Sequence, residues 1–596
     1  MSVQYFIGID LGTTNSVVAY LPADSEDATE PKILPIPQLV AAGTKESLNG
    51  LASFLYIGEK NESGSGTYDL DWAKKRNFAV GELARRNAAE VPQRIVGGAK
   101  SWLAHHGVDR HDKILPYNAP DEVAKVSPVT ATRLYLEHLI AAWNSAMPDA
   151  PLEDQEVVLT VPASFDASAR ELTHEAAIAA GLPAQLVLLE EPQAAVYAWL
   201  ADQGDRWRRK LSVGSQLLVC DVGGGTTDLT LVGVSEDAGN LFLERLAVGN
   251  HLLVGGDNMD LALAYEMASQ FAEAGNDLDP WQSVSLWHAC RAAKERLLGE
   301  KPPKKHSISV LGRGSKLVGG TISHDLKKQQ AIDLLLAGFF PECKLTDRPA
   351  QHRASGFQEM GLPFESEAAI TRHVAAFLSD QSGSGKGAVQ PTHVLFNGGV
   401  FRSALLRSRM KEVIAKWFKQ EPTELSRTRD DLDVAVARGA AYYGWSKHRG
   451  AIRIRGGTAR SYYVGIESAG LAVPGTQRPL HALCVVPFGM EEGTEQDVPA
   501  DEIGLVVGEP AQFRFFGSST RKQDKPGDVL RRWSESDLQE TDSLEATLTV
   551  DDVPDQPLMP VRFQSRVTEL GMFELWCVSA ESEQRWKLEF SVREET

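Results

Sequence analysis

The chain has 596 residues, of which 43% are hydrophobic and 24% are charged, and its formal net charge is −19 at pH 7. This length exceeds what one hydrophobic core supports, so we expect about three to five structural units. The composition is typical of a soluble globular protein and excludes a disordered chain. The negative charge repels polyanions, which argues against nucleic acid or anionic membranes as partners.

The N-terminus begins a strand at Val3 and shows neither the basic region nor the apolar core of an export signal. Apolar runs such as 334–340 are far shorter than the roughly 20 residues that span a bilayer. The five cysteines are scattered without paired spacing, which argues against a zinc site or a disulfide framework. We therefore expect a cytoplasmic protein with no membrane partner.

Two stretches, 6–18 and 218–229, share one pattern: a strand, an Asp, a glycine turn, Thr-Thr and a second strand. The glycines allow the backbone to approach a ligand closely, and the turn amides can face an anion. The acids at the same point of each copy, Asp10 and Asp221, can hold a hydrated divalent cation between them. One copy alone would be an ordinary tight turn. The duplication predicts two related lobes with a Mg-nucleotide site in the cleft between them.

Up to about residue 445 the pattern alternates strands with amphipathic helices. A buried strand is predicted at 156–161, and Asp166 is predicted to cap a helix that runs to Ala180. A strand at 185–189 then leads into a helix with Pro192 in its first turn. This order predicts a layered α/β architecture. The basic segment 206–210 is interpreted as a solvated loop.

After about residue 459 the helical pattern ends and short strands follow. The strands are predicted at 462–466, 482–487, 512–516, 544–550, 561–567 and 586–592. The last of them alternates strictly between apolar and polar residues, as a half-buried strand does. The C-terminal part is predicted to be an all-β sandwich, with Gly456 and Gly457 as the hinge before it.

Five further segments follow the order of landmarks in the DnaK-type heat-shock protein 70 family, which the chain resembles over residues 1 to about 445. The segments are Val161–Phe165, Glu191–Ala195, Gly255–Asp260, Val394–Arg402 and Asp433–Ala441. The resemblance implies an α/β, actin-like (ribonuclease H-like, duplicated) bilobed ATPase domain over 1–448. Its lobes are placed at about 1–208 and 209–415, with a returning helix at about 432–446. Residues 459–596 are expected to form a β-sandwich domain of the substrate-binding kind.

The resemblance also implies ATP and Mg as cofactors, together with a set of site residues. Asp10 and Asp221 would hold Mg through water, and the residues expected to be catalytic are Asp10, Lys100, Glu191, Asp221 and Thr226. The residues expected to bind nucleotide are Gly12, Thr13, Thr14, Asn15, Gly223, Gly224, Gly225, Thr226, Gly256, Asp257, Lys294, Gly398, Gly399, Arg402 and Asp433.

The chain departs from the family at three places. Its adenosine helix, 291–298, keeps only the family's lysine, Lys294, with Arg291, Glu295 and Leu298 at the other positions. The segment 449–457 is short and basic, whereas the family's linker is acidic and rich in leucine. No helical lid is expected after the last strand.

The resemblance implies an ATP-hydrolysing chaperone that acts on unfolded or client proteins, with co-chaperones as further candidate partners and with roles in protein folding and stress response. Two alternatives stay open. The first is a regulatory scaffold that uses the nucleotide as a conformational signal with little turnover, and the second is a small-molecule kinase of the actin-like superfamily. A C-terminal sandwich argues against a kinase, which has no need of one. No nucleic-acid partner is expected.

Overall fold

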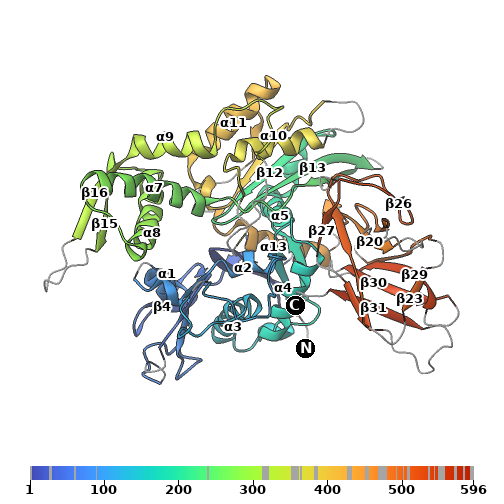
Figure 1. Ribbon diagram of the computed structural model, residues 1–596, viewed down its shortest axis with the longest axis horizontal. Coiled ribbons are helices and arrows are strands. Elements are labelled where there is room, and N and C mark those ends of the chain that lie inside the picture. Colours follow the sequence, from blue (N-terminus) through green and yellow to red (C-terminus); the bar gives the residue numbers. More distant parts are fainter. Residues whose placement is uncertain are drawn as a thin grey trace, which may run out of the picture.

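The structure, a computed structural model (Figure 1), describes residues 3–590 with gaps. The gaps are 26–29, 60–61, 63, 89, 118, 238–239, 312–320, 351–361, 363–364, 382–386, 426–431, 450–453, 456, 459, 468–478, 492, 501–502, 507–509, 535–536, 542–543, 548–557, 569–572 and 581–583. The predicted hinge residue Gly456 and most of the segment 449–457 lie outside the described residues.

The first large sheet has the strand order β11-β10-β1-β2-β3, with β6 also paired to β2. Its strands are β1 (Tyr5–Leu11), β2 (Asn15–Pro22), β3 (Lys32–Ile33), β6 (Leu51–Ala52), β10 (Glu156–Val161) and β11 (Val187–Glu190). Strands β1 and β2 form an antiparallel hairpin, whereas β10 and β11 run parallel to β1.

The second large sheet repeats this arrangement in the order β18-β17-β12-β13-β14-β19. Its strands are β12 (Gln216–Val222), β13 (Thr227–Asp237), β14 (Asn240–Val248), β17 (His393–Asn397), β18 (Thr423–Glu424) and β19 (Ile454–Arg455). Strands β12 and β13 form the antiparallel hairpin, and β17 and β18 are the parallel strands beside it. The duplication predicted from the two hairpins therefore extends to whole sheets.

Helices α5 (Glu191–Gln203) and α13 (Ala435–His448) share one buried cluster with strands of both sheets. The two helices cross so closely that a Cβ on Gly439 would lie 1.7 Å from the carbonyl oxygen of Ala194. A side chain at position 439 would push the helices apart, so glycine is required there. This contact fixes the distance between the two helices that pack against both sheets.

Further helices cover the outer faces of the two sheets, and each group shares a separate apolar core with its sheet. On the first sheet they are α2 (Ala99–Leu103), α3 (Pro128–Ala146) and α4 (Ala167–Ala180), and on the second α7 (Gly256–Glu273), α8 (Pro280–Leu297), α9 (Lys328–Phe339), α10 (Ile370–Asp380) and α11 (Ala404–Phe418). The predicted cap of α4 is confirmed, because the side chain of Asp166 accepts a 2.9 Å bond from the amide of Ala169.

Two smaller sets of elements flank this frame. Near the first sheet lie β4 (Ile36–Ala41), β5 (Thr44–Leu48), β7 (Phe54–Ile57), β8 (Phe78–Val80), β9 (Ile95–Gly97) and α1 (Glu82–Asn87). Beside α8 the strands β15 (Lys305–Leu311) and β16 (Thr321–Lys327) form a two-stranded hairpin.

The described C-terminal residues form strands in two antiparallel sheets, as predicted for an all-β part. The first sheet holds β20 (Ser461–Glu467), β21 (Leu480–Val486), β25 (Phe515–Ser518), β26 (Val529–Leu530) and β27 (Gln539–Glu540). The second holds β22 (Thr494–Asp497), β23 (Ile503–Val506), β24 (Pro510–Phe513), β28 (Leu544–Thr547), β29 (Leu558–Val567), β30 (Phe573–Ser579) and β31 (Arg585–Phe590).

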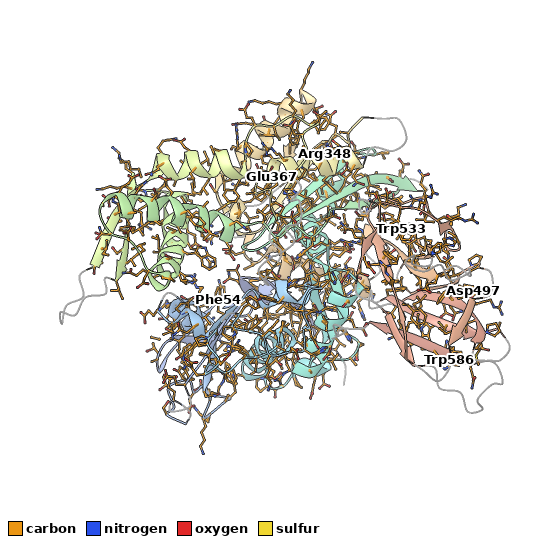
Figure 2. The ribbon with its side chains drawn as sticks, in the orientation of Figure 1. Phe54, Arg348, Glu367, Asp497, Trp533 and Trp586 are labelled. Carbon is orange, nitrogen blue, oxygen red and sulfur yellow. The ribbon has the colours of Figure 1, made fainter. Side chains whose placement is uncertain are left out.

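One apolar cluster joins these two sheets. The rings of Tyr462, Phe515 and Phe573 lie nearly parallel, with centroids 5.4 to 5.8 Å apart. On the opposite face of the five-stranded sheet, Trp533, which is labelled in Figure 2, packs edge-on against Phe516, with ring centroids 5.5 Å apart. Ala167, the first residue of α4, belongs to the joint cluster, so the C-terminal sheets pack directly on the first sheet's helix layer.

The structure corrects two local predictions. The strand predicted at 512–516 is two strands, because the chain leaves the seven-stranded sheet after β24 and enters the five-stranded sheet at β25. The segment 206–210, predicted as a loop, contains the short helix α6 (Trp207–Lys210). Trp207 is fully buried, and Arg208 lies 4.8 Å over its ring, so the aromatic side chain anchors a segment that its charges made look solvated.

A buried histidine in α3 predicts acid sensitivity. The ring of His138 is 2% exposed, its Nε2 donates to the carbonyl of Pro37 at 2.9 Å, and burial lowers its pKa to about 4. Below pH 6.5 this histidine binds a proton in the unfolded chain but stays neutral in the folded chain. The free energy of unfolding therefore falls by on the order of 3 kcal/mol as the pH drops from 6.5 towards 4. Urea unfolding across this range should show a smaller acid loss in His138→Gln than in the wild type. Equal slopes would contradict the assignment.

Candidate nucleotide site

A candidate site is a cavity of about 520 Å³ lined by residues of both large sheets. This volume lies within the usual range for small-molecule sites. The predicted site residues that line it are Asp10, Gly12, Thr13, Thr14, Asn15, Lys100, Glu191, Asp221, Gly223, Gly224, Thr226, Gly256, Asp257, Lys294, Gly398, Gly399, Arg402 and Asp433. Gly225 is not part of the lining and faces the first hairpin, since a Cβ there would lie 3.3 Å from Thr13 Cγ2.

Each hairpin acid is held by a polar neighbour from the next parallel strand. Thr160, on β10, donates its hydroxyl to Asp10 Oδ1 at 3.2 Å, and Asn397, at the end of β17, donates its amide to Asp221 Oδ2 at 2.7 Å. The duplicated sheets thus orient both carboxylates in the same way. Asn397 was not among the site residues predicted from the sequence, although its position between a predicted strand and Gly398 could have indicated a role in the site.

Gly398 brings the end of β17 against the second hairpin. Its φ is +83°, and a Cβ there would lie 2.3 Å from the Val222 carbonyl oxygen and 2.7 Å from Asp221 Oδ1. Any other residue would therefore clash with the backbone and displace the acid. A glycine at this position keeps the carboxylate of Asp221 in place at the cavity wall.

Lys100 and Glu191 form an ion pair at the base of the cavity. The lysine comes from α2 and the acid from the first turn of α5, and their side chains are 6% and 13% exposed. The pair brings together two residues 91 positions apart that the family resemblance had placed at one site. Any ligand in the cavity would meet a partly neutralised acid rather than a free cation.

The acids of the cavity raise one another's pKa values. Burial, followed by the charge of Glu191, raises the pKa of Asp10 to about 7, with Lys100 opposing the shift. Burial and Glu191 hold the pKa of Asp221 well above its usual range, and burial raises that of Glu191 despite Lys100. Asp10, Asp221 and Glu191 crowd one cavity and raise one another's pKa values, so a bound cation would relieve their repulsion.

The donor set fits a hydrated Mg²⁺ ion. Mg²⁺ prefers oxygen ligands and usually keeps several waters, binding through one or two carboxylates and the phosphates of its substrate. Asp10 and Asp221 offer such carboxylates. Within the described ranges, no group of three or more His, Cys, Asp or Glu side chains is placed to hold a metal.

Helix α8 supplies a cavity wall in which the charges already pair with each other. Arg291 donates to Asp257 at 2.6 Å and to Asp260 at 3.0 Å, and Lys294 approaches Asp260 at 2.7 Å. Asp260, which is 1% exposed, was missed as the centre of this network. The four positions of this helix that were compared with the family's adenosine helix all line the cavity: Arg291, Lys294, Glu295 and Leu298.

Arg402 and Asp433 stand at another part of the cavity lining, where their charged groups approach to 3.5 Å. The side chain of Arg402 is about one third exposed. An exposed planar cation in such a place can stack on an aromatic base. The arginine is thus the candidate face for a nucleobase.

Asp228 is a further acid that the sequence reading did not assign. It lies directly opposite Asp221 in the β12–β13 hairpin, is 3% exposed, and accepts a bond from the Ser164 hydroxyl. The same hydroxyl lies 2.7 Å from His251 Nδ1. The acid therefore links the second hairpin to the segment before α4, and the C-terminal sheets pack on Ala167 at the start of that helix.

Two related sheets around a cavity lined by one acid from each hairpin define the class of actin-like ATPase folds. Residues 70–328 match the family model described as Hsp70 protein. Residues 70–328 are therefore similar to Hsp70 proteins, and members of that family bind ATP with Mg, hydrolyse it and act as chaperones. The matched range contains Lys100, Glu191 and the second hairpin, whereas the first hairpin lies before it. Among the described helices, none is long and apolar enough to cross a membrane.

Proposed function

We propose that this chain is a chaperone that hydrolyses ATP in the cavity between two lobes and uses its C-terminal β-sandwich to hold exposed apolar segments of client proteins. The observation that carries the proposal is the convergence of Asp10, Asp221, Lys100 and Glu191 on one cavity from four separate elements. Phosphoryl transfer needs positioned charge more than covalent chemistry, and these side chains can supply it.

The roles follow from where the groups lie. Asp10 and Asp221 would hold Mg²⁺ through water, and the ion would offset negative charge on the phosphates. The hairpin turns, with Thr13 and Thr226 among the lining residues, would donate to phosphate oxygens. Lys100 holds Glu191 at the cavity base, where the carboxylate can orient a water molecule for in-line attack.

The junction of the two parts supports coupling between the site and the sandwich. Arg245, on β14, pairs with Glu190, the residue beside Glu191, and also donates to the carbonyl of Gly457. Strand β19 adds to the edge of β14, and its Ile454 amide donates to the Tyr197 hydroxyl at 2.8 Å. A change in the position of Glu191 would therefore reach the start of the sandwich through short, buried contacts.

Steady-state ATPase activity, measured with and without a permanently unfolded protein, tests the proposal. A chaperone should hydrolyse ATP faster when a client is present. Measurable ATP binding without turnover, and without client stimulation, would instead favour a regulatory scaffold. Phosphorylation of a small molecule would favour a kinase. Fluorescence titration of the full chain with apolar peptides provides the second readout, and absence of binding would reject the client role.

The α8 wall predicts weak selection among nucleobases. Arg291 and Lys294 are committed to Asp257 and Asp260, so fewer polar groups are free to read ribose and base. Selectivity requires buried polar groups that the wrong base would leave unpaired. We expect ATP affinity weaker than is usual for the family and little preference for ATP over GTP. Calorimetric titration with ATP, GTP and ADP measures both, and a strong adenine preference would show that another residue reads the base.

A further inference from the structure

The hairpin β15–β16 is a strongly basic region of an acidic protein. Between Lys301 and Lys328 the sequence has seven Lys and Arg residues and one acidic residue, Asp325, while the whole chain carries a net charge of −19. In Figure 1 the hairpin projects at the end of the molecule opposite the C-terminal strands. A local field of this sign stands out against the charge of the rest of the surface.

Strand pairing places Lys305 and Lys327 on one face of the hairpin. Ile308 and Val310 of β15 and Leu326 of β16 are buried, so the alternate residues of both strands point away from the core. The exposed face consists of four cross-strand pairs, which are Lys305 with Lys327, Ser307 with Asp325, Ser309 with Ser323 and Leu311 with Thr321.

Two lysines therefore stand directly opposite each other in the ladder. Like charges in this position destabilise a sheet pair. Lys305 is relieved by an ion pair with Asp325, which also accepts from Ser307. Lys327 has no carboxylate partner among the described residues. The opposed pair of Lys305 and Lys327 therefore destabilises the hairpin.

Three more lysines extend the charge at the base of the hairpin. Lys301 and Lys304 precede β15, and Lys328 follows β16, its amide bonded to the Lys304 carbonyl at 2.9 Å. Within the part of the chain that the structure describes, none of the three forms an ion pair. We name the surface of Lys301, Lys304, Lys305, Lys327 and Lys328 the lysine face.

We propose that the lysine face docks an acidic, extended segment of a partner protein. Lysine ammonium groups are point charges that suit dispersed carboxylates, and the neighbouring hydroxyls of Ser307, Ser309 and Ser323 offer donors beside them. The four cross-strand pairs of the face contain neither aromatic rings for stacking on bases nor arginines for bidentate phosphate binding. The outer backbone edges of this two-stranded sheet can also pair with an extended peptide.

The test uses a labelled poly-glutamate peptide of about 20 residues and the full chain, with fluorescence anisotropy as the readout. The variant Lys304→Glu/Lys327→Glu should bind about tenfold more weakly than the wild type, because four units of charge change at the face. Lys74→Glu/Lys113→Glu, which makes the same charge change at exposed lysines elsewhere, should stay within about twofold. Raising the salt concentration should weaken wild-type binding.

The variant also separates binding from stability. Glutamate at 327 faces Lys305, so it replaces a like-charge pair with an opposite-charge pair and should not lower the urea unfolding midpoint. An alternative role for these lysines is to prevent the exposed strand edges from pairing with other chains. Glutamates would serve that role equally well, so it predicts no change in peptide binding. No wild-type binding, or equal loss in the control variant, would overturn the proposal. Tighter binding of single-stranded DNA or of anionic vesicles would overturn it in favour of those ligands. None of these readouts depends on ATP hydrolysis.

Discussion

Replacing Asp10 by Asn should lower the single-turnover rate of ATP hydrolysis by about a hundredfold or more. The substitution keeps the shape of the side chain and its place beside Thr160, so the fold should persist. It removes one of the two hairpin carboxylates proposed to hold Mg²⁺, and charge developing on the phosphates would then be poorly offset. Single-turnover assays with labelled ATP measure the rate, and calorimetry shows whether ATP still binds.

Asp24→Asn is the matched control, because Asp24 lies just beyond β2, is exposed, and does not belong to the cavity lining. Its rate should equal that of the wild type.

Glu191→Gln should bind ATP and hydrolyse it slowly, since the water would lose its orienting carboxylate. The hydrolysis rate of Lys100→Ala should fall by a similar factor, because the substitution removes the cation beside Asp10 and Glu191. A normal rate in Asp10→Asn with ATP bound would remove the hairpin acids from the mechanism.

Replacing Arg245 by Ala should lower the free energy of unfolding by about 3 to 5 kcal/mol, the usual cost of removing one partner from a buried ion pair. The side chains of Arg245 and Glu190 are 2% and 6% exposed. Arg245 and Arg170 hold the pKa of Glu190 below its usual range although burial opposes ionisation. Without Arg245 the acid would keep only Arg170, and the carbonyl of Gly457 would lose a donor.

Urea unfolding measures this loss, with Arg514→Ala as the control. Arg514 forms an ion pair with Glu540 at 2.6 Å, but both side chains are about half exposed, so its removal should cost at most about 1 kcal/mol. Limited proteolysis should also show faster cleavage near residue 457 in Arg245→Ala. An equal, small effect of both substitutions would mean that the junction does not depend on the buried pair.

The local features of the chain were predictable because they depend on neighbouring residues. The hairpins at 6–18 and 218–229, the cap at Asp166 and the stop of α4 before Gly181 follow from turn and helix chemistry within a few positions. The resemblance to Hsp70 proteins extended this reading to residues such as Lys100 and Glu191, and the structure brings those two side chains into contact.

Local pattern failed where the partner of a segment decided its structure. Alternation predicted a strand across 512–516, but periodicity carries no information on which of two sheets a residue joins. Charge predicted a loop at 206–210, yet the burial of Trp207 made it a helix. Likewise, nothing near Asp260 in the sequence showed that two basic side chains of α8 would surround it.

By itself the sequence determined the kind of site: two acids on duplicated hairpins, the glycines of their turns, and a helix that lacks most of the family's base-reading residues. Each of these depends on residue type and short spacing. Only the tertiary structure decided which groups share a charge, a hydrogen bond or a cavity. Asn397 lies 176 residues from Asp221, and Gly457 lies 212 residues from Arg245. Such contacts arise because packing of the two sheets on α5 and α13 brings distant strands together, and no local pattern encodes that distance.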